Sequence, residues 1–223
     1  SLASIPASSH PAIRVVFNLQ SSGQATPLVH SFTVSYTTQA AAVGLTLVGS
    51  PLKVVFGKAV KLSGLLSQGG TGLAGQSVTL AAKPFGTSVF KVFATVTTSS
   101  GGAYSTSTKP KKQTAYTASA SGVTAPPTVI VNVAQRLTLS VRRSGGKVYF
   151  KGTLGPKKRR RVVVVQVRAG KRWKVLARVK TSRRSTFKGV RSLTPGHKYN
   201  FRAKTGKYPG LLAGTSRIVR LRR

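Results

Sequence analysis

The sequence predicts an all-β protein built of tandem β-sandwiches, and three observations support this fold class. Apolar and polar residues alternate with a period of two, and these stretches are rich in β-branched and aromatic residues. Gly, Pro or Ser interrupts the pattern about every 8 to 12 residues, which is the spacing of short strands and turns in a sandwich. No segment shows a convincing helical period, and 223 residues suffice for one to two domains with cores of their own.

The first part of the chain predicts a hairpin. Residues 12–19 and 28–36 have the alternation of strands, and the turn between them contains Gly23 and Pro27. Two strands alone are only marginally stable in water. We therefore expect residues 1–38 to be the terminal strands of an incomplete β-sandwich, whose other strands are missing or are supplied by another chain.

The rest of the chain contains an internal repeat. The repeat offset is about the length of one sandwich domain, which predicts two tandem sandwiches rather than a solenoid. The division is then 1–38, 39–135 and 136–223, the last strongly basic. Five segments recur: 45–47 as 137–139, 58–66 as 147–154, 90–98 as 173–181, the strand around Tyr116 as that around Tyr199, and 128–133 as 217–221.

Three stretches carry a resemblance to a known family. Residues 57–64 (G-K-x-V-x-L-S-G), 75–80 (G-Q-S-V-T-L) and 90–105 resemble the bacterial Ig-like and fibronectin-like sandwich modules of secreted cell-surface proteins, especially actinobacterial ones. Residues 12–36 resemble the final hairpin of a surface sandwich. The resemblance implies tandem Ig-like architecture and a secreted or cell-surface location, but it does not define a role, because such modules have many.

The composition excludes several chemistries. The chain has 37 Lys and Arg, no Asp, no Glu and no Cys. This excludes carboxylate pairs, Ser-His-Asp triads, EF-hands, thiol catalysis, disulfides and thiolate metal sites. We therefore expect no enzyme, no catalytic residue and no cofactor. The sequence also shows no apolar stretch long enough to predict a transmembrane helix.

The absence of acidic residues needs an explanation, and three are open. The chain is a polyanion-binding protein, an engineered supercharged chain, or a sequence assigned from an experimental density map, in which carboxylate side chains are weak. Residues 97–104 favour the explanation that the sequence was assigned from a density map. The modules that the chain resembles have an acidic turn there, whereas this sequence has T-T-S-S-G-G-A-Y. Asp favours such turns because it hydrogen-bonds its own following backbone.

Residues 136–223 carry 28 of the 37 basic residues, and their densest run is the main candidate binding site. The run falls in the predicted hairpin loop between residues 147–154 and 161–168, where it is either a solvated loop or a contact for phosphate or sulfated polysaccharide. The candidate polyanion-binding residues are Lys157, Lys158, Arg159, Arg160 and Arg161 of this run, with Lys171 and Arg172.

Trp173, the single tryptophan, has two interpretations. It is a carbohydrate-stacking or cation–π platform beside Lys171 and Arg172, or a large aromatic residue of the inter-sheet core, and we expect the core. Core or corner packing is also expected for the tyrosines in predicted strands: Tyr104, Tyr116, Tyr149 and Tyr199.

A metal site is not expected. His10, His30 and His197 are the only histidines, they lie far apart in sequence, and no Cys or carboxylate is present to complete a ligand set.

The leading functional hypothesis is a non-catalytic extracellular structural or adhesive protein, whose neighbouring copies complete the N-terminal sandwich by strand addition into a filament or array. Its partners are copies of itself, other surface proteins or acidic cell-envelope polysaccharide. One alternative is a polyanion-binding module in residues 136–223, with nucleic acid bound only non-specifically because base-reading elements are lacking. The other is the accessory region of a larger secreted enzyme.

Overall fold

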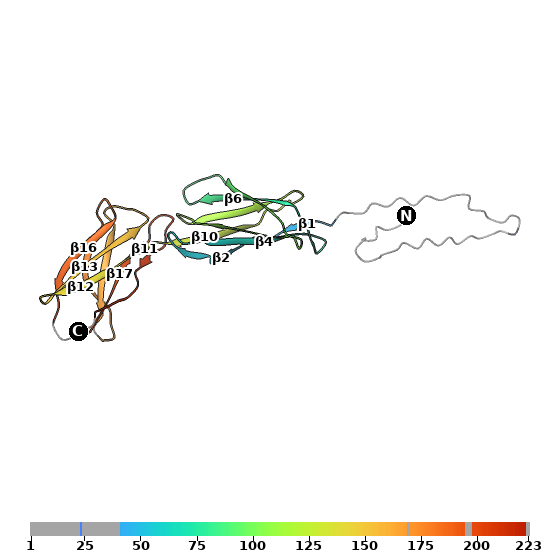
Figure 1. Ribbon diagram of the computed structural model, residues 1–223. Coiled ribbons are helices and arrows are strands. Elements are labelled where there is room, and N and C mark those ends of the chain that lie inside the picture. The colour runs from blue at the N-terminus through green and yellow to red at the C-terminus, as the bar shows by residue number, and fades with distance from the viewer. Residues whose placement is uncertain (1–22, 24–40, 169, 195–197, 222–223) are drawn as a thin grey trace. The chain divides into compact units, whose positions relative to one another are not determined.

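The computed structural model describes residues 23, 41–168, 170–194 and 198–221. Within them, every regular element is a strand, which confirms the all-β prediction. Val43–Arg223 forms one compact unit containing two Ig-like sandwiches in tandem (Figure 1). The predicted hairpin of residues 12–36 falls outside the described residues.

The first sandwich consists of two sheets. In one sheet, β4 (Val60–Gln68) pairs with β1 (Val43–Leu45), β2 (Val48–Ser50), β5 (Thr71–Gly72) and β8 (Ala103–Thr108). The other sheet has the order β3 (Lys53–Val55), β10 (Thr128–Ala134), β9 (Thr114–Ser119), β6 (Ser77–Pro84) and β7 (Lys91–Thr97). Strand β3 is parallel to β10, and the other pairs are antiparallel.

The second sandwich has the same two-sheet plan. Strand β13 (Lys147–Gly155) pairs with β11 (Arg136–Leu137), β12 (Ser140–Ser144) and β16 (Thr186–Ser192). The facing sheet has the order β15 (Lys174–Lys180), β14 (Val162–Arg168), β17 (Tyr199–Thr205) and β18 (Gly214–Thr215), with β19 (Val219–Leu221) also paired to β17. Within the described residues, the segments predicted as strands are strands to within a few residues, whereas β3, β12, β16 and β18 lie outside the predicted segments.

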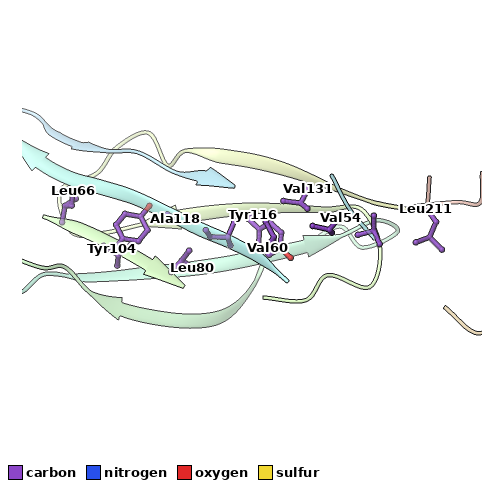
Figure 2. Packing of buried hydrophobic residues seen from close by; sticks show 12 residues of the cluster. Val54, Val60, Leu66, Leu80, Tyr104, Tyr116, Ala118, Val131 and Leu211 are labelled. Atoms are coloured by element: carbon purple, nitrogen blue, oxygen red, sulfur yellow. The ribbon is translucent and has the colours of Figure 1, made fainter. Parts of the chain in front are cut away.

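Each sandwich buries a hydrophobic cluster between its sheets, because alternate side chains of each strand point inward. Figure 2 shows the first cluster, with Tyr104 and Tyr116 among the buried side chains as expected. Its buried members are Val54, Val60, Leu62, Leu66, Val78, Leu80, Tyr104, Tyr116, Ala118, Val131, Val133 and Leu211. The second comprises Leu137, Phe150, Leu154, Val163, Val165, Ala177, Phe187 and Ala203.

The internal repeat is visible in equivalent contacts. The hydroxyl of Thr46 accepts the Leu65 N–H at 2.8 Å, and that of Thr138 accepts the Thr153 N–H at 2.9 Å. Each sandwich also has a bulge at the same place, between Leu80 and Ala81 and between Val165 and Gln166.

The same glycine contact recurs beside these bonds. A Cβ at Gly64 would lie 1.9 Å from the Thr46 carbonyl oxygen, and one at Gly152 would lie 2.1 Å from that of Thr138. An aromatic side chain also lies against each glycine, through the hydroxyl of Tyr104 in the first copy and the ring of Phe187 in the second.

The segment 206–212 of the second sandwich packs on the first. Leu211 belongs to the first cluster and lies at its end beside Val54 (Figure 2). The buried Gln135 side chain donates to the carbonyls of Gly206 at 2.7 Å and Leu212 at 3.1 Å. The Leu212 N–H donates to Val133 at 2.8 Å. Ending the chain at Gln135 would therefore remove part of the first core.

Tyr104 gives a stability prediction with a defined sign. Its buried hydroxyl donates to the Thr46 carbonyl, and burial raises the pKa of Tyr104 from 10.0 to about 12. A raised pKa in the folded state favours the protonated form, so this stability is complete below pH 10 and is lost as pH rises towards 12. Tyr104→Phe should lower the free energy of unfolding at neutral pH by about 1 kcal/mol. It should also reduce the alkaline loss, of which a part stays because burial raises the pKa of Tyr116 as well.

Denaturant unfolding between pH 7 and 12 tests this, with Tyr149→Phe, outside the core, as the matched control. The same alkaline loss in Tyr104→Phe as in the parent would contradict the assignment.

Candidate polyanion-binding surface

The cations of the second sandwich have no carboxylate side chain to pair with, because the chain contains none. Several instead pack on aromatic rings, where the ring quadrupole attracts a cation. In the second sandwich these pairs are Arg142 on Tyr149, Lys158 and Arg161 on Tyr208, and Arg168 and Arg202 on Trp173, at 4.1–5.0 Å from the ring centroids.

The loop of residues 156–161, here the basic loop, is held by the side chain of Thr181. The Thr181 hydroxyl donates to the Lys158 carbonyl at 2.6 Å and accepts the Arg161 N–H at 2.9 Å. Two backbone bonds, from Arg160 N–H to Thr181 at 2.8 Å and from Thr181 N–H to Arg161 at 2.9 Å, complete the frame. The basic loop is thus fixed to the end of β15.

The first sandwich contains the same frame without the cations. The Thr98 hydroxyl donates to the Leu73 carbonyl at 2.6 Å and accepts the Gln76 N–H at 2.9 Å. The backbone bonds from Gly75 to Thr98 and from Thr98 to Gln76 are also equivalent. Leu73, Gly75 and Gln76 therefore occupy the positions of Lys158, Arg160 and Arg161.

A second turn lies against the basic loop and adds two cations that sequence reasoning missed. The Ser185 hydroxyl in this turn donates to the Lys158 carbonyl at 3.0 Å and accepts the Lys158 N–H. Arg183 and Arg184 are exposed there, and the equivalent turn of the first sandwich has Ser100 and Gly101 instead. Extending the repeat alignment through this turn would have identified them.

Together the loop and turn form a cluster of five exposed cations, here the basic cluster: Lys157, Arg159, Arg160, Arg183 and Arg184. The cations are close because the loop and turn are hydrogen-bonded to each other, and no anionic side chain separates them. This geometry is suited to several anionic groups along one polymer.

Lys158 and Arg161, also predicted contacts, face the fold. Both are partly buried and lie over the ring of Tyr208, at 5.0 and 4.9 Å. The terminal Nη2 of Arg161 donates to the carbonyls of Gly206 and Lys207, at 3.1 and 3.0 Å. Their positions favour a structural role in holding the 206–208 segment.

Trp173 corrects an expectation. It lies outside the second core cluster, half-buried, with the guanidinium groups of Arg168 and Arg202 over its ring. The inner positions are filled by Val165 and Ala177 instead. Lys171 and Arg172 are exposed in the preceding turn.

Tyr149 is likewise not in the core, because it lies on the outer face of β13 under Arg142. In the next row of this face Lys151 lies opposite Lys188, and both are exposed. Like charges directly opposite one another destabilise a sheet, so this face too carries uncompensated charge. Tyr199 is half-buried beside Phe201, at 6.2 Å between ring centroids.

Other site classes find little support. The three histidines fall outside the described residues, and within the described part no group of ligating side chains is placed to hold a metal. In that same part, no helix is long and apolar enough to cross a membrane.

Comparison with known proteins finds structural likeness only. No protein-family model matches the chain, and no curated protein matches its sequence. The chain is similar to the Yersinia pseudotuberculosis adhesin InvE, with 14% identity, a TM-score of 0.37, and coverage of 81% of this chain and 60% of InvE.

Two further solved structures are similar at the same level. A C-terminal 282-residue fragment of intimin, solved with the intimin-binding domain of the translocated intimin receptor, has 12% identity, a TM-score of 0.44, and coverage of 81% and 64%. Red sea bream transglutaminase has 11% identity, a TM-score of 0.43, and coverage of 79% and 31%. The chain thus spans less than two thirds of each of these three chains.

Arg160 gives the second prediction. Its φ is 57°, in the left-handed region, where the equivalent Gly75 has 66°. A side chain there costs about 1 kcal/mol relative to glycine, so Arg160→Gly should raise the free energy of unfolding by about that amount.

Arg160→Gln is the matched control, because it removes the charge and keeps the strained backbone. Thermal and denaturant unfolding of both variants measure the difference. Equal stability of the two variants would contradict a backbone cause.

Proposed function

We propose that this chain is a non-catalytic structural and adhesive protein of the cell surface or extracellular space, whose second sandwich binds acidic polymers. The observation that carries the proposal is the pair of equivalent frames around Thr98 and Thr181. The first frame has no charged side chain at the equivalent exposed positions, whereas the second and its adjoining turn present five exposed cations.

The fixed backbone of the basic loop favours binding. Because Thr181 and Ser185 hold the loop before any ligand arrives, less conformational entropy is lost on association. The affinity then comes from replacing small counterions along the polymer, so it falls steeply with salt.

Acidic polysaccharide is the favoured polymer. Sequence-specific nucleic-acid binding needs a base-reading element or free aromatic faces for stacking. The aromatic rings of Tyr208 and Trp173 in the second sandwich already carry Lys and Arg side chains. What the surface offers is cationic groups, which match sulfate, phosphate and carboxylate groups.

Assembly through strand addition remains part of the proposal, as does the division into 1–38, 39–135 and 136–223. A separate edge lies in the first sandwich, where β7 is the last strand of its sheet and exposes Val92 and Phe93. Unpaired apolar edges of this kind accept a further strand. Packing of residues 12–36 only within their own chain would contradict the filament.

Binding of the full chain to immobilised heparin, a sulfated polysaccharide probe, tests the adhesive surface. We expect Lys157→Gln, Arg159→Gln, Arg183→Gln and Arg184→Gln, combined in one variant, to weaken binding at least tenfold. The slope of log K against log salt should become less steep, because fewer counterions are released on binding.

The matched control removes the same charge from the first sandwich, through glutamine substitutions of the exposed Lys53, Lys58, Lys61 and Lys91. It should change binding little. If both variants lose the same affinity, net charge rather than the basic cluster is responsible, and the proposed surface is wrong.

A further inference from the structure

We propose that Arg168 and Arg202, held on the ring of Trp173, form a second binding site that takes oxoanion groups of an acidic polysaccharide. The site lies on the outer face of β14 and β17. This proposal rests on the proposed function, and the site is separate from the basic cluster. Arg168 ends β14 and Arg161 precedes its start, so they lie about 20 Å apart along the strand.

The Trp173 ring holds both guanidinium groups, and Gln166 also holds that of Arg202. Their central carbons lie 4.1 Å (Arg202) and 5.0 Å (Arg168) from the centroid of the Trp173 ring. The Nε of Arg202 donates to the Oε1 of Gln166 at 2.7 Å, across the β14–β17 pairing. Planar forks held in this way are organised for two parallel hydrogen bonds to one anionic group.

The charges of this pair are not neutralised by the protein. Both groups lie within 5.0 Å of one ring, and the sequence has no carboxylate side chain. The Nε of Arg168 is buried and has no hydrogen-bond partner within the described residues. An oxoanion bound by these guanidinium groups would neutralise part of their charge and accept N–H donors that the protein leaves unpaired.

The first sandwich has a reduced form of the same arrangement. Lys83 lies over the ring of Phe90, 4.7 Å from its centroid, at the positions equivalent to Arg168 and Trp173. The position of Arg202 is taken by Thr117, which pairs with Ala81 as Arg202 pairs with Gln166. The second cation and both planar forks are therefore particular to the second sandwich.

The guanidinium groups, rather than the Trp173 ring, would bind the ligand. The two guanidinium groups on the ring compete with a sugar or a base for its faces. The bidentate geometry of arginine instead matches sulfate and carboxylate groups, which are frequent on acidic polysaccharides.

Trp173 provides a direct readout, because it is the only tryptophan of the chain. The full chain is titrated at low salt with a heparin-derived hexasaccharide while tryptophan emission is recorded. We expect a saturable change in emission, and its loss in the double variant Arg168→Gln and Arg202→Gln.

Two further variants keep the test specific. The double variant Lys83→Gln and Lys91→Gln removes the same net charge from the first sandwich and should keep the emission response. Arg202→Lys keeps the charge without the planar fork and should weaken the response roughly tenfold, which separates recognition from loss of folding.

The outcomes distinguish this site from the proposed function. Retention of heparin binding with no emission change in the parent chain would overturn the Arg168–Arg202 site and leave the basic cluster standing. Equal loss of response in the Lys83 and Lys91 control would overturn it as well, as would an unchanged response in both arginine variants. An oligothymidylate of equal charge that binds as tightly, with the same emission change, would overturn the polysaccharide assignment. If the parent chain binds no heparin at low salt, both proposals are wrong.

Discussion

Positive charge without a carboxylate partner is the constraint on which the second sandwich depends. In most proteins, Lys and Arg on neighbouring strands alternate with Asp and Glu, and cross-strand pairs become attractive. Here Lys151 lies opposite Lys188, and two guanidinium groups share the ring of Trp173. The compensation within the protein comes from aromatic rings and backbone carbonyls.

The two sandwiches share a backbone arrangement but differ in the residues that they expose. Their bulges and turn frames are equivalent, and Thr98 and Thr181 make equivalent hydrogen bonds. The exposed positions on these frames carry Gly, Ala or Ser in the first copy and Lys or Arg in the second. Because an uncharged copy makes the same backbone bonds, the cations of the second copy are not needed to form them. At Arg160 the turn even places a side chain on a left-handed backbone, which favours glycine.

Much of this architecture could be predicted from the sequence. Alternation located β13, β14 and β15, and the repeat paired Trp173 with Phe90. The inward or outward orientation of Trp173 could not be predicted, because an aromatic residue next to a strand can face either side. The role of Leu211 could not be predicted either. It packs in the first core from a loop some 80 positions beyond Val131, a contact between residues far apart in sequence.

At the candidate site, the sequence identified the basic loop by its density of charge alone. It could not separate the exposed Lys157 from Arg161, which donates to backbone carbonyls of Gly206 and Lys207. That distinction depends on which carbonyls the folded segment 206–208 presents. Arg183 and Arg184 join the cluster only because Ser185 is hydrogen-bonded to Lys158.

The melting temperature as a function of salt tests the claim of uncompensated charge most directly. If the cations repel one another without partners, screening stabilises the fold, and Tm should rise between about 10 and 150 mM monovalent salt as the Debye length shortens from about 30 to 8 Å. A polyanion added at constant ionic strength should raise Tm further. A Tm that stays constant or falls over this range would contradict the account, because attractive ion pairs weaken under screening.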